Sequence, residues 1–291
     1  MTLSAPDSSR YLVTHTVVNM YLKPSRSSEQ VSQTLMGHVV DLIEQQDDWS
    51  WVQTDDAYRG WVESRWLIPV PDAAGLTPLI VPFTEVRSEP RPDAALVRRI
   101  SIAALVAPVS RLETDPAWTS GRLLSEPESL VYAPTASLAR TAQKAAMDSI
   151  PEKVLEWSLQ FLGTPYLWGG SSAFGLDCSG IVQLCYRLSG IILRRDADIQ
   201  RDDPRFVPVE FEELLPGDLV FFGREGRITH IGMHHSGRSK EGGTFIHSAG
   251  GSGVIITAWG DDRYTPNYVD ARRLDPARAH EPVTRFEAED R

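Results

Sequence analysis

Cysteine is scarce in this chain, with two residues among 291. They stand at positions 178 and 185, about 10 Å apart along one expected helix, which is too far for a disulfide. This scarcity excludes a scaffold held together by disulfides. Two unpaired thiols are typical of a protein from a reducing cytoplasm.

Long apolar runs and basic runs are also missing. No stretch approaches the roughly 20 apolar residues that a membrane span needs, and the first residues lack the basic start and apolar core of a secretory signal. The net charge of −10 argues against a nucleic-acid partner. These absences predict a cytoplasmic protein with no membrane or nucleic-acid partner, or a secreted one if a signal has been removed.

The run Asp-Cys-Ser-Gly at residues 177–180 is the most informative feature present. Turn formers precede it, and residues 181–188 are apolar at helical spacing with Gly190 just past their end. Asp177 is expected to cap this helix, which places Cys178 in the first turn. There the helix dipole and unpaired N–H groups favour a thiolate. The alternative is a buried, inert cysteine, because free cysteine is among the most buried residue types.

A cysteine nucleophile needs a base, and the base needs an orienting group. Residues 214–223 are typical of a turn and a buried strand, 228–234 of a second strand with His230, and 244–249 of a third with His247. The short, glycine-rich connections predict an antiparallel meander packed on the cysteine helix, with both histidines facing the thiol. Zinc binding by the same three side chains is the alternative. The motif frames favour catalysis, with no metal and no other cofactor.

Together these motifs resemble the NlpC family of papain-like bacterial cysteine peptidases, which cut peptidoglycan stem peptides. The resemblance covers roughly residues 148–275 and rests on four ordered runs: Asp-Cys-Ser-Gly at 177–180, Pro-Gly-Asp-Leu-Val-Phe-Phe at 216–222, Thr-His-Ile-Gly at 229–232 and Phe-Ile-His-Ser at 245–248. It implies Cys178 as the nucleophile, His230 as general base and acid, and His247 as the residue that orients the imidazole.

The resemblance also implies a role for residues around the cysteine. Tyr166 is expected near the oxyanion, with Asp177 and Ser179 lining the substrate groove. Residues 194–200 resemble a family stretch that lines the same groove; the alternative is a solvated charged loop. We expect Asp177 to pair with the free α-ammonium of an N-terminal L-Ala, and its alternative is a helix cap with no other role.

Ahead of this segment the chain repeats itself weakly, in two copies of about 65 residues with short alternating strands. The first copy resembles a bacterial SH3-like domain through Asp-Trp-Ser-Trp-Val at 48–52 and Tyr-Arg-Gly-Trp-Val at 58–62, and the second has lost the Gly-Trp pair. The predicted fold is α+β, with a papain-like domain in which the cysteine helix packs on an antiparallel sheet, preceded by two small SH3-like β-barrels. The predicted boundaries are 1–70 and 71–140 for the barrels, 141–280 for the peptidase and 281–291 for a flexible tail, with a helix over 138–147 leading into the peptidase.

The barrel tryptophans are predicted to fill the barrel cores. A second hypothesis is that the first barrel docks on the peptidase and closes one end of its groove. It follows from resemblance to the NlpC-type enzymes that carry SH3-like domains and cut free murein peptides, and it implies Tyr58 as a contact to the substrate's N-terminus. An acidic residue expected earlier in that barrel is replaced here by His38.

The predicted function is that of a cysteine endopeptidase in cell-wall peptide recycling. It would hydrolyse the γ-D-glutamyl–diamino acid bond of murein peptides with a free N-terminal L-Ala. The alternatives are an acyltransferase or a peptide-binding protein on the same scaffold, or a hydrolase of intact peptidoglycan. The motifs leave open which diamino acid is accepted and the oligomeric state.

Overall fold

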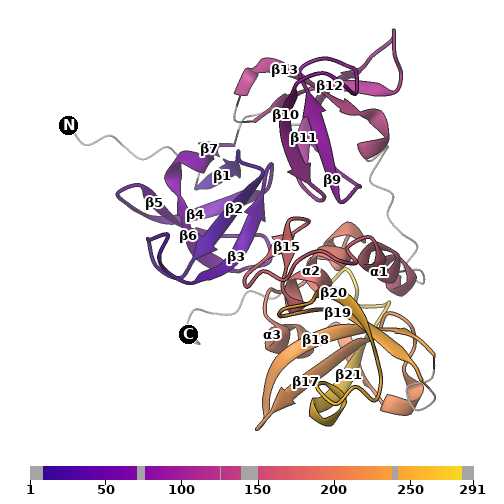
Figure 1. Ribbon diagram of the computed structural model, residues 1–291. Coiled ribbons are helices and arrows are strands. Elements are labelled where there is room, and N and C mark those ends of the chain that lie inside the picture. The colour runs from indigo at the N-terminus through magenta and orange to yellow at the C-terminus, as the bar shows by residue number, and fades with distance from the viewer. Residues whose placement is uncertain (1–8, 71–75, 125, 139–149, 238–241, 284–291) are drawn as a thin grey trace. The chain divides into compact units, whose positions relative to one another are not determined.

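The computed structural model describes residues 9–70, 76–124, 126–138, 150–237 and 242–283. The chain divides into two compact units, Met1–Ala142 and Gln143–Arg291 (Figure 1). Within the described ranges, no helix is long and apolar enough to cross a membrane.

The first unit begins with a seven-stranded sheet in the order β3-β2-β6-β5-β4-β1-β7. Every second side chain of β2, β5 and β6 is buried, as the period of a strand requires. The buried side chains form one apolar core that includes Val18, Met20, Val52 and Val62. The elements are β1 (Arg10–Val13), β2 (Val17–Tyr21), β3 (Gln30–Leu35), β4 (Val39–Gln46), β5 (Trp49–Gln53), β6 (Arg59–Glu63), the 3-10 turn η1 (Ser64–Trp66) and β7 (Leu67–Pro69).

Most tryptophans of this first barrel do not form its core, which corrects the prediction from sequence. Trp49 and Trp51 alternate with buried residues along β5, so their rings are half-buried on the opposite face. There the rings of Trp51 and Trp61 pack with 5.4 Å between centroids. Trp66 does pack against the core. The reason is that successive side chains of a strand point to opposite faces of the sheet, so Val52 and the neighbouring Trp51 cannot both face the core.

The second sheet of this unit has the order β10-β9-β13-β12-β11-β8, which repeats the order of the first six strands. The internal repeat in the sequence therefore corresponds to two barrels of the same topology, as predicted. The elements are β8 (Thr77–Pro78), β9 (Phe83–Arg87), β10 (Leu96–Ser101), β11 (Leu105–Arg111), β12 (Trp118–Leu123), β13 (Glu126–Pro134) and η2 (Thr135–Ser137).

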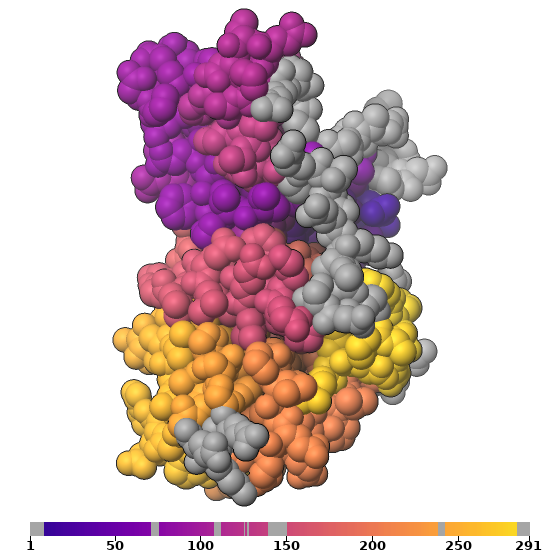
Figure 2. Space-filling model, turned by 90° about the vertical axis from the view of Figure 1, so that its right-hand side faces the viewer, coloured from indigo at the N-terminus to yellow at the C-terminus, as the bar shows by residue number. Residues whose placement is uncertain are grey.

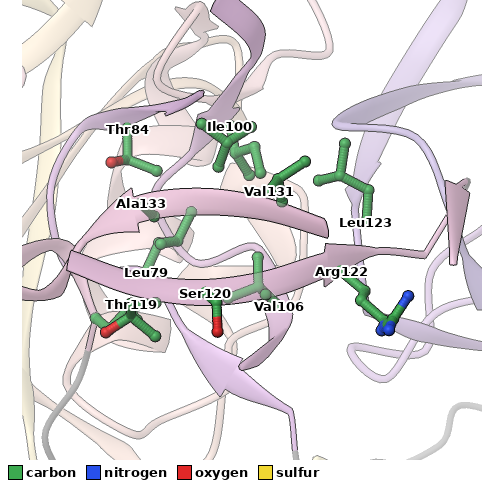
Figure 3. A pocket seen from close by; sticks show the side chains of 13 residues that line it. Leu79, Thr84, Ile100, Val106, Thr119, Ser120, Arg122, Leu123, Val131 and Ala133 are labelled. Atoms are coloured by element: carbon green, nitrogen blue, oxygen red, sulfur yellow. The ribbon is translucent and has the colours of Figure 1, made fainter. Parts of the chain in front are cut away.

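The interior of the second barrel contains a cavity of about 20 Å³. Figure 3 shows Leu79, Val106 and Val131 among the side chains that line it, together with the small Ala133. At about 24 cal/mol per Å³, a void of this size costs about 0.5 kcal/mol. The second barrel is therefore slightly underpacked.

Hydrogen bonds join the two barrels within this unit. The N–H of Leu105 donates to the carbonyl of Met36 at 2.8 Å, and Nε2 of His38 lies 2.9 Å from the carbonyl oxygen of Ala103. A carbonyl only accepts, so Nε2 of His38 carries the proton. His38, which stands where an acidic residue was expected, therefore contributes to the contact between the barrels.

The second unit is built on a six-stranded antiparallel sheet in the order β16-β21-β17-β18-β19-β20. The predicted meander is confirmed as β17, β18 and β19, and α2 packs against β18 and β19. A short ribbon of β14 and β15 precedes α2. The elements are α1 (Ile150–Leu159), β14 (Ser171–Ser172), β15 (Gly175–Leu176), α2 (Cys178–Leu188), α3 (Ala197–Arg201), β16 (Phe206–Val209), η4 (Phe211–Glu213), β17 (Leu219–Arg224), β18 (Arg227–Ser236), β19 (Thr244–Ala249), β20 (Gly253–Ala258), η6 (Thr265–Asn267) and β21 (Tyr268–Leu274).

Helix α1 packs against α2 and was not predicted. Its buried residues Ile150, Val154 and Ser158 recur every four positions, which is the helical signal that the sequence offers. The helix predicted over 138–147 lies outside the described residues except for Leu138, which forms a β-bridge with Leu79 instead.

The segment after β21 packs on the same unit and appears in yellow in Figure 2. The N–H of Asp275 donates to the carbonyl of Arg205 at 2.9 Å, and Ala279 is 1% exposed. The carbonyl of Glu281 accepts from Nη1 of Arg205, so the first residue of the predicted tail is bound to the domain. Residues 284–291 lie outside the described ranges.

Candidate active site

Helix α2 begins at Cys178, and its N-cap is Asp177, as predicted. Oδ1 of Asp177 accepts from the N–H of Gly180 at 2.7 Å, and Oδ2 accepts from the N–H of Gly169 at 2.9 Å. A side chain at Gly180 would put its Cβ 2.1 Å from the carbonyl oxygen of Gly170. Glycine is therefore required at position 180, because the preceding loop packs directly on the first turn of the helix.

Arg195 holds the Asp177 carboxylate from the other side. Nη1 donates to Oδ1 at 3.0 Å and Nη2 to Oδ2 at 2.5 Å, and Nη1 also donates to Oγ of Ser179 at 2.9 Å. The Arg195 side chain is 1% exposed. Buried Gln200 donates to the carbonyl of Arg194 at 2.7 Å. The stretch 194–200 therefore supports the candidate site from within the protein and is not a solvated loop.

These contacts bear on the expected pairing of Asp177 with a substrate ammonium, which stays a prediction. Both oxygens of its carboxylate already accept from Arg195 and from backbone N–H groups, and Ser179 adds a third donor to Oδ1. The guanidinium balances the charge. A substrate ammonium would therefore meet a carboxylate whose charge is already balanced by Arg195.

A line of hydrogen bonds runs across the sheet beside the helix. Nε2 of His230 on β18 lies 2.7 Å from Nδ1 of His247 on β19, and Nε2 of His247 lies 2.8 Å from Oγ1 of Thr257 on β20. The Tyr264 ring packs 5.3 Å from the His230 ring and 4.6 Å from the His247 ring, between centroids. The structure thus brings His230 and His247 together, as the sequence predicted. Thr257 and Tyr264 were missed.

The backbone of Ile231 on β18 hydrogen-bonds to the sulfur of Cys178, so the sulfur lies beside this strand. This hydrogen bond lowers the pKa of the thiol. Burial and the nearby Asp177 carboxylate act the other way and raise the pKa of Cys178 to about 12. The helix N-terminus was expected to favour the thiolate. Desolvation of the sulfur outweighs that effect, since burial disfavours the charged form.

Burial also lowers the pKa of His230 to about 4 and that of His247 to about 3. The neighbouring His230 lowers the pKa of His247 further, and Asp177 partly offsets the effect on His230. At neutral pH the resting site therefore holds a neutral thiol and two neutral imidazoles. Such a site is suited to attack by sulfur with simultaneous transfer of its proton to a base.

Tyr166 is half-buried on the loop before α2 and forms a β-bridge with Leu176. Burial and the neighbouring Cys178 raise its pKa to about 12, so its hydroxyl keeps its proton at neutral pH. A protonated phenol close to the sulfur is able to donate a hydrogen bond to an oxyanion.

Two further hypotheses from the sequence concern a substrate contact in the first barrel and a metal site. Tyr58 lies in the first barrel, where it is partly buried against the core, and its substrate-binding role stays a prediction. His234 is bound by structural contacts, with Nε2 3.0 Å from the carbonyl of Gly237. Among the residues that the structure describes, no group of three or more His, Cys, Asp or Glu side chains is arranged to hold a metal ion.

Comparison with known proteins finds relatives of both parts of the chain. A sequence profile described as the NlpC/P60 family matches residues 163–273, and one described as the bacterial dipeptidyl-peptidase Sh3 domain matches residues 20–67. A gamma-D-glutamyl-L-lysine dipeptidyl-peptidase of Bacillus cereus is 29% identical over 274 residues, which span 84% of this chain and 75% of that protein. The probable endopeptidase NlpC of Escherichia coli is 32% identical over 116 residues, which span 38% of this chain and 70% of that protein.

The shared fold extends to the barrels. The crystal structure of an NlpC/P60 family protein from Bacillus cereus matches 91% of this chain and 99% of its own, with a TM-score of 0.76 at 20% identity. The profile match and the likeness to the Escherichia coli protein show that the chain belongs to the NlpC/P60 family of cysteine peptidases.

Proposed function

We propose that this peptidase hydrolyses the γ-D-glutamyl–diamino acid bond of murein peptides that carry a free N-terminal L-Ala. The main support is the domain pairing, in which a barrel that matches the dipeptidyl-peptidase Sh3 profile precedes an NlpC/P60 domain. Further support is the likeness, over most of both chains, to a gamma-D-glutamyl-L-lysine dipeptidyl-peptidase. A dipeptidyl-peptidase removes two residues from a free N-terminus, so the product here would be L-Ala-D-Glu.

In the proposed acylation step, Sγ of Cys178 bonds to the γ-carbonyl carbon of D-Glu. The thiol proton passes to Nδ1 of His230, since Nε2 of that ring is bound to His247. The Tyr166 hydroxyl and backbone N–H groups near the cysteine stabilise the oxyanion. The C–N bond then breaks, and the departing amine takes the proton from His230.

Deacylation reverses these roles. Water attacks the thioester carbonyl and gives a proton to His230, and the sulfur leaves and takes the proton back. His247 supports both steps because its hydrogen bond with Nε2 of His230 holds the ring in place. Asp177, Ser179 and Arg195 line the first turn of α2 as one bonded set, and we propose that this set shapes the groove.

Three substrates test the proposal: L-Ala-γ-D-Glu-diaminopimelate, its N-acetylated form and intact peptidoglycan. Wild-type protein should release L-Ala-D-Glu from the first and leave the other two nearly uncut, and Cys178→Ala should release nothing. Comparable cleavage of the acetylated peptide or of the wall would refute the requirement for a free amine and support the alternative, a wall hydrolase. Transfer of the acyl group to an added amine in preference to water would support the acyltransferase alternative.

The first barrel provides a second test. The proposed contact of Tyr58 with the substrate amine rests on the family resemblance alone. If it is correct, Tyr58→Phe should raise KM for the free peptide and leave the alkylation rate of Cys178 unchanged. An unchanged KM would remove Tyr58 from the proposed site.

The cytoplasmic location also stays a prediction.

A further inference from the structure

Thr257 closes the line of hydrogen bonds that starts at His230. On the antiparallel pair of β19 and β20, Ile255 lies opposite His247, and Thr257 is two residues further along the same face. His247 is 0% exposed and Thr257 is 6% exposed. With 2.8 Å between Nε2 and Oγ1 and little water to compete, the contact determines where the protons of both rings lie.

Each neutral imidazole carries one proton, so two arrangements of the line are possible. If Thr257 donates to His247, then His247 donates from Nδ1 to His230, and the remaining proton of His230 lies on Nδ1. His230 is then unable to accept the proton of the thiol. If Thr257 accepts, the protons of both rings lie on Nε2, and Nδ1 of His230 is free to act as a base.

The charged form of His230 requires the second arrangement as well. An imidazolium donates from both nitrogens, so Nδ1 of His247 must accept, and Nε2–H of His247 must donate to the hydroxyl. The charged and titratable groups around the two rings are Asp177, which caps α2, and Asp261, Arg263 and Tyr264 from the loop after β20; Cys178 in turn lies near Tyr264. In the described part of the site, the hydroxyl of Thr257 is the acceptor that the structure provides for Nε2 of His247.

We propose that Thr257 is a positioning residue that accepts a hydrogen bond from His247 and thereby keeps Nδ1 of His230 free for the thiol proton. This inference rests on the proposed roles of Cys178 and His230, and it adds Thr257 as a fourth residue to the set of Cys178, His230 and His247. Thr257 does not touch the reacting atoms. It acts through the two histidines.

The test replaces the hydroxyl by a methyl group in Thr257→Val, which keeps the shape of the side chain. The buried Nε2–H of His247 then has no acceptor, the first arrangement is favoured and the charged form of His230 is disfavoured. We expect kcat to fall tenfold to a hundredfold with little change in KM, which corresponds to about 1.4–2.8 kcal/mol. Thr257→Ser, which retains the hydroxyl, should restore most of the rate.

A second readout is the rate at which iodoacetamide alkylates Cys178, followed against pH. In Thr257→Val the rate near neutral pH should fall about tenfold or more, which displaces the profile toward higher pH by about one unit, because transfer of the thiol proton to His230 during attack is lost. The matched control is Thr244→Val, which removes another threonine–histidine hydrogen bond of the same sheet, 3.1 Å from Nδ1 of His235. The control should leave the alkylation profile unchanged.

Alkylation needs no murein peptide, so this test separates the inference from the proposed substrate. A shifted profile in a protein that cuts none of the peptides would support the role of Thr257 and refute the substrate. A wild-type profile and wild-type kcat in Thr257→Val would overturn the inference. A serine variant as impaired as the valine variant would also overturn it, because the hydroxyl would then not be what matters.

Discussion

Replacing Arg195 by methionine should destabilise the peptidase unit strongly. The guanidinium is 1% exposed and donates to both oxygens of Asp177, at 3.0 and 2.5 Å. Methionine keeps much of the side-chain volume but leaves the carboxylate buried without its counter-ion. Breaking a buried pair in this way typically costs about 3–5 kcal/mol in the free energy of unfolding.

The double variant Asp177→Asn, Arg195→Met should be less destabilised than Arg195→Met alone, because the charge that was left unpaired is gone. Lys153→Met is the matched control. Its ammonium lies 2.7 Å from Glu156 on the same unit, but both side chains are about half exposed or more. Loss of that exposed pair should cost less than about 1 kcal/mol.

The assay must report on the peptidase unit, since the chain also contains two barrels. Cys185 is 0% exposed within α2, so its pulsed alkylation at increasing urea concentration, read by mass spectrometry, follows unfolding of that unit. The same samples report on Cys178, whose pKa Arg195 lowers; its alkylation under native conditions should be slower in Arg195→Met. A cost below about 1 kcal/mol, or a double variant as unstable as the single one, would refute the argument for a buried charge pair.

Three further predictions concern other groups. Iodoacetamide should label Cys178, which is partly exposed, well before the fully buried Cys185, and should abolish hydrolysis; equal labelling with activity retained would contradict the nucleophile assignment. The folded protein binds a proton at His247 only near pH 3, whereas the unfolded chain binds it near pH 6.5, so stability is lost as pH falls through this window. His247 accounts for a loss of about 2 kcal/mol between pH 7 and pH 5 in urea titrations, and His230 adds a similar loss, so His247→Gln should reduce the slope by roughly half. Gly37→Ala should destabilise the first unit more than Gly190→Ala destabilises the second in thermal melts. Both glycines have positive φ, but a Cβ at position 37 would meet a backbone oxygen at 2.4 Å and one at position 190 meets nothing; equal costs would show that the backbone angle alone decides.

The local features of the site were predictable because each depends on residues close together in the chain. Asp177 as a helix cap, α2 itself and Gly190 just past its end follow from a capping residue, apolar spacing and a residue that tolerates positive φ. Alternation and turn residues likewise predicted the strands that carry His230 and His247. The resemblance of the four ordered motifs to the NlpC family then indicated the family of the chain.

The tertiary structure decided how these pieces act on one another. Arg195 reaches Asp177 across 18 positions of the chain and Thr257 meets His247 across ten, and both contacts depend on packing and strand register, which local patterns do not encode. The same packing also determines whether the side chains of the site are charged. A cysteine at a helix N-terminus is a candidate thiolate from sequence alone, but burial against β18 raises its pKa, because the cost of removing charge from water exceeds the gain from the helix dipole.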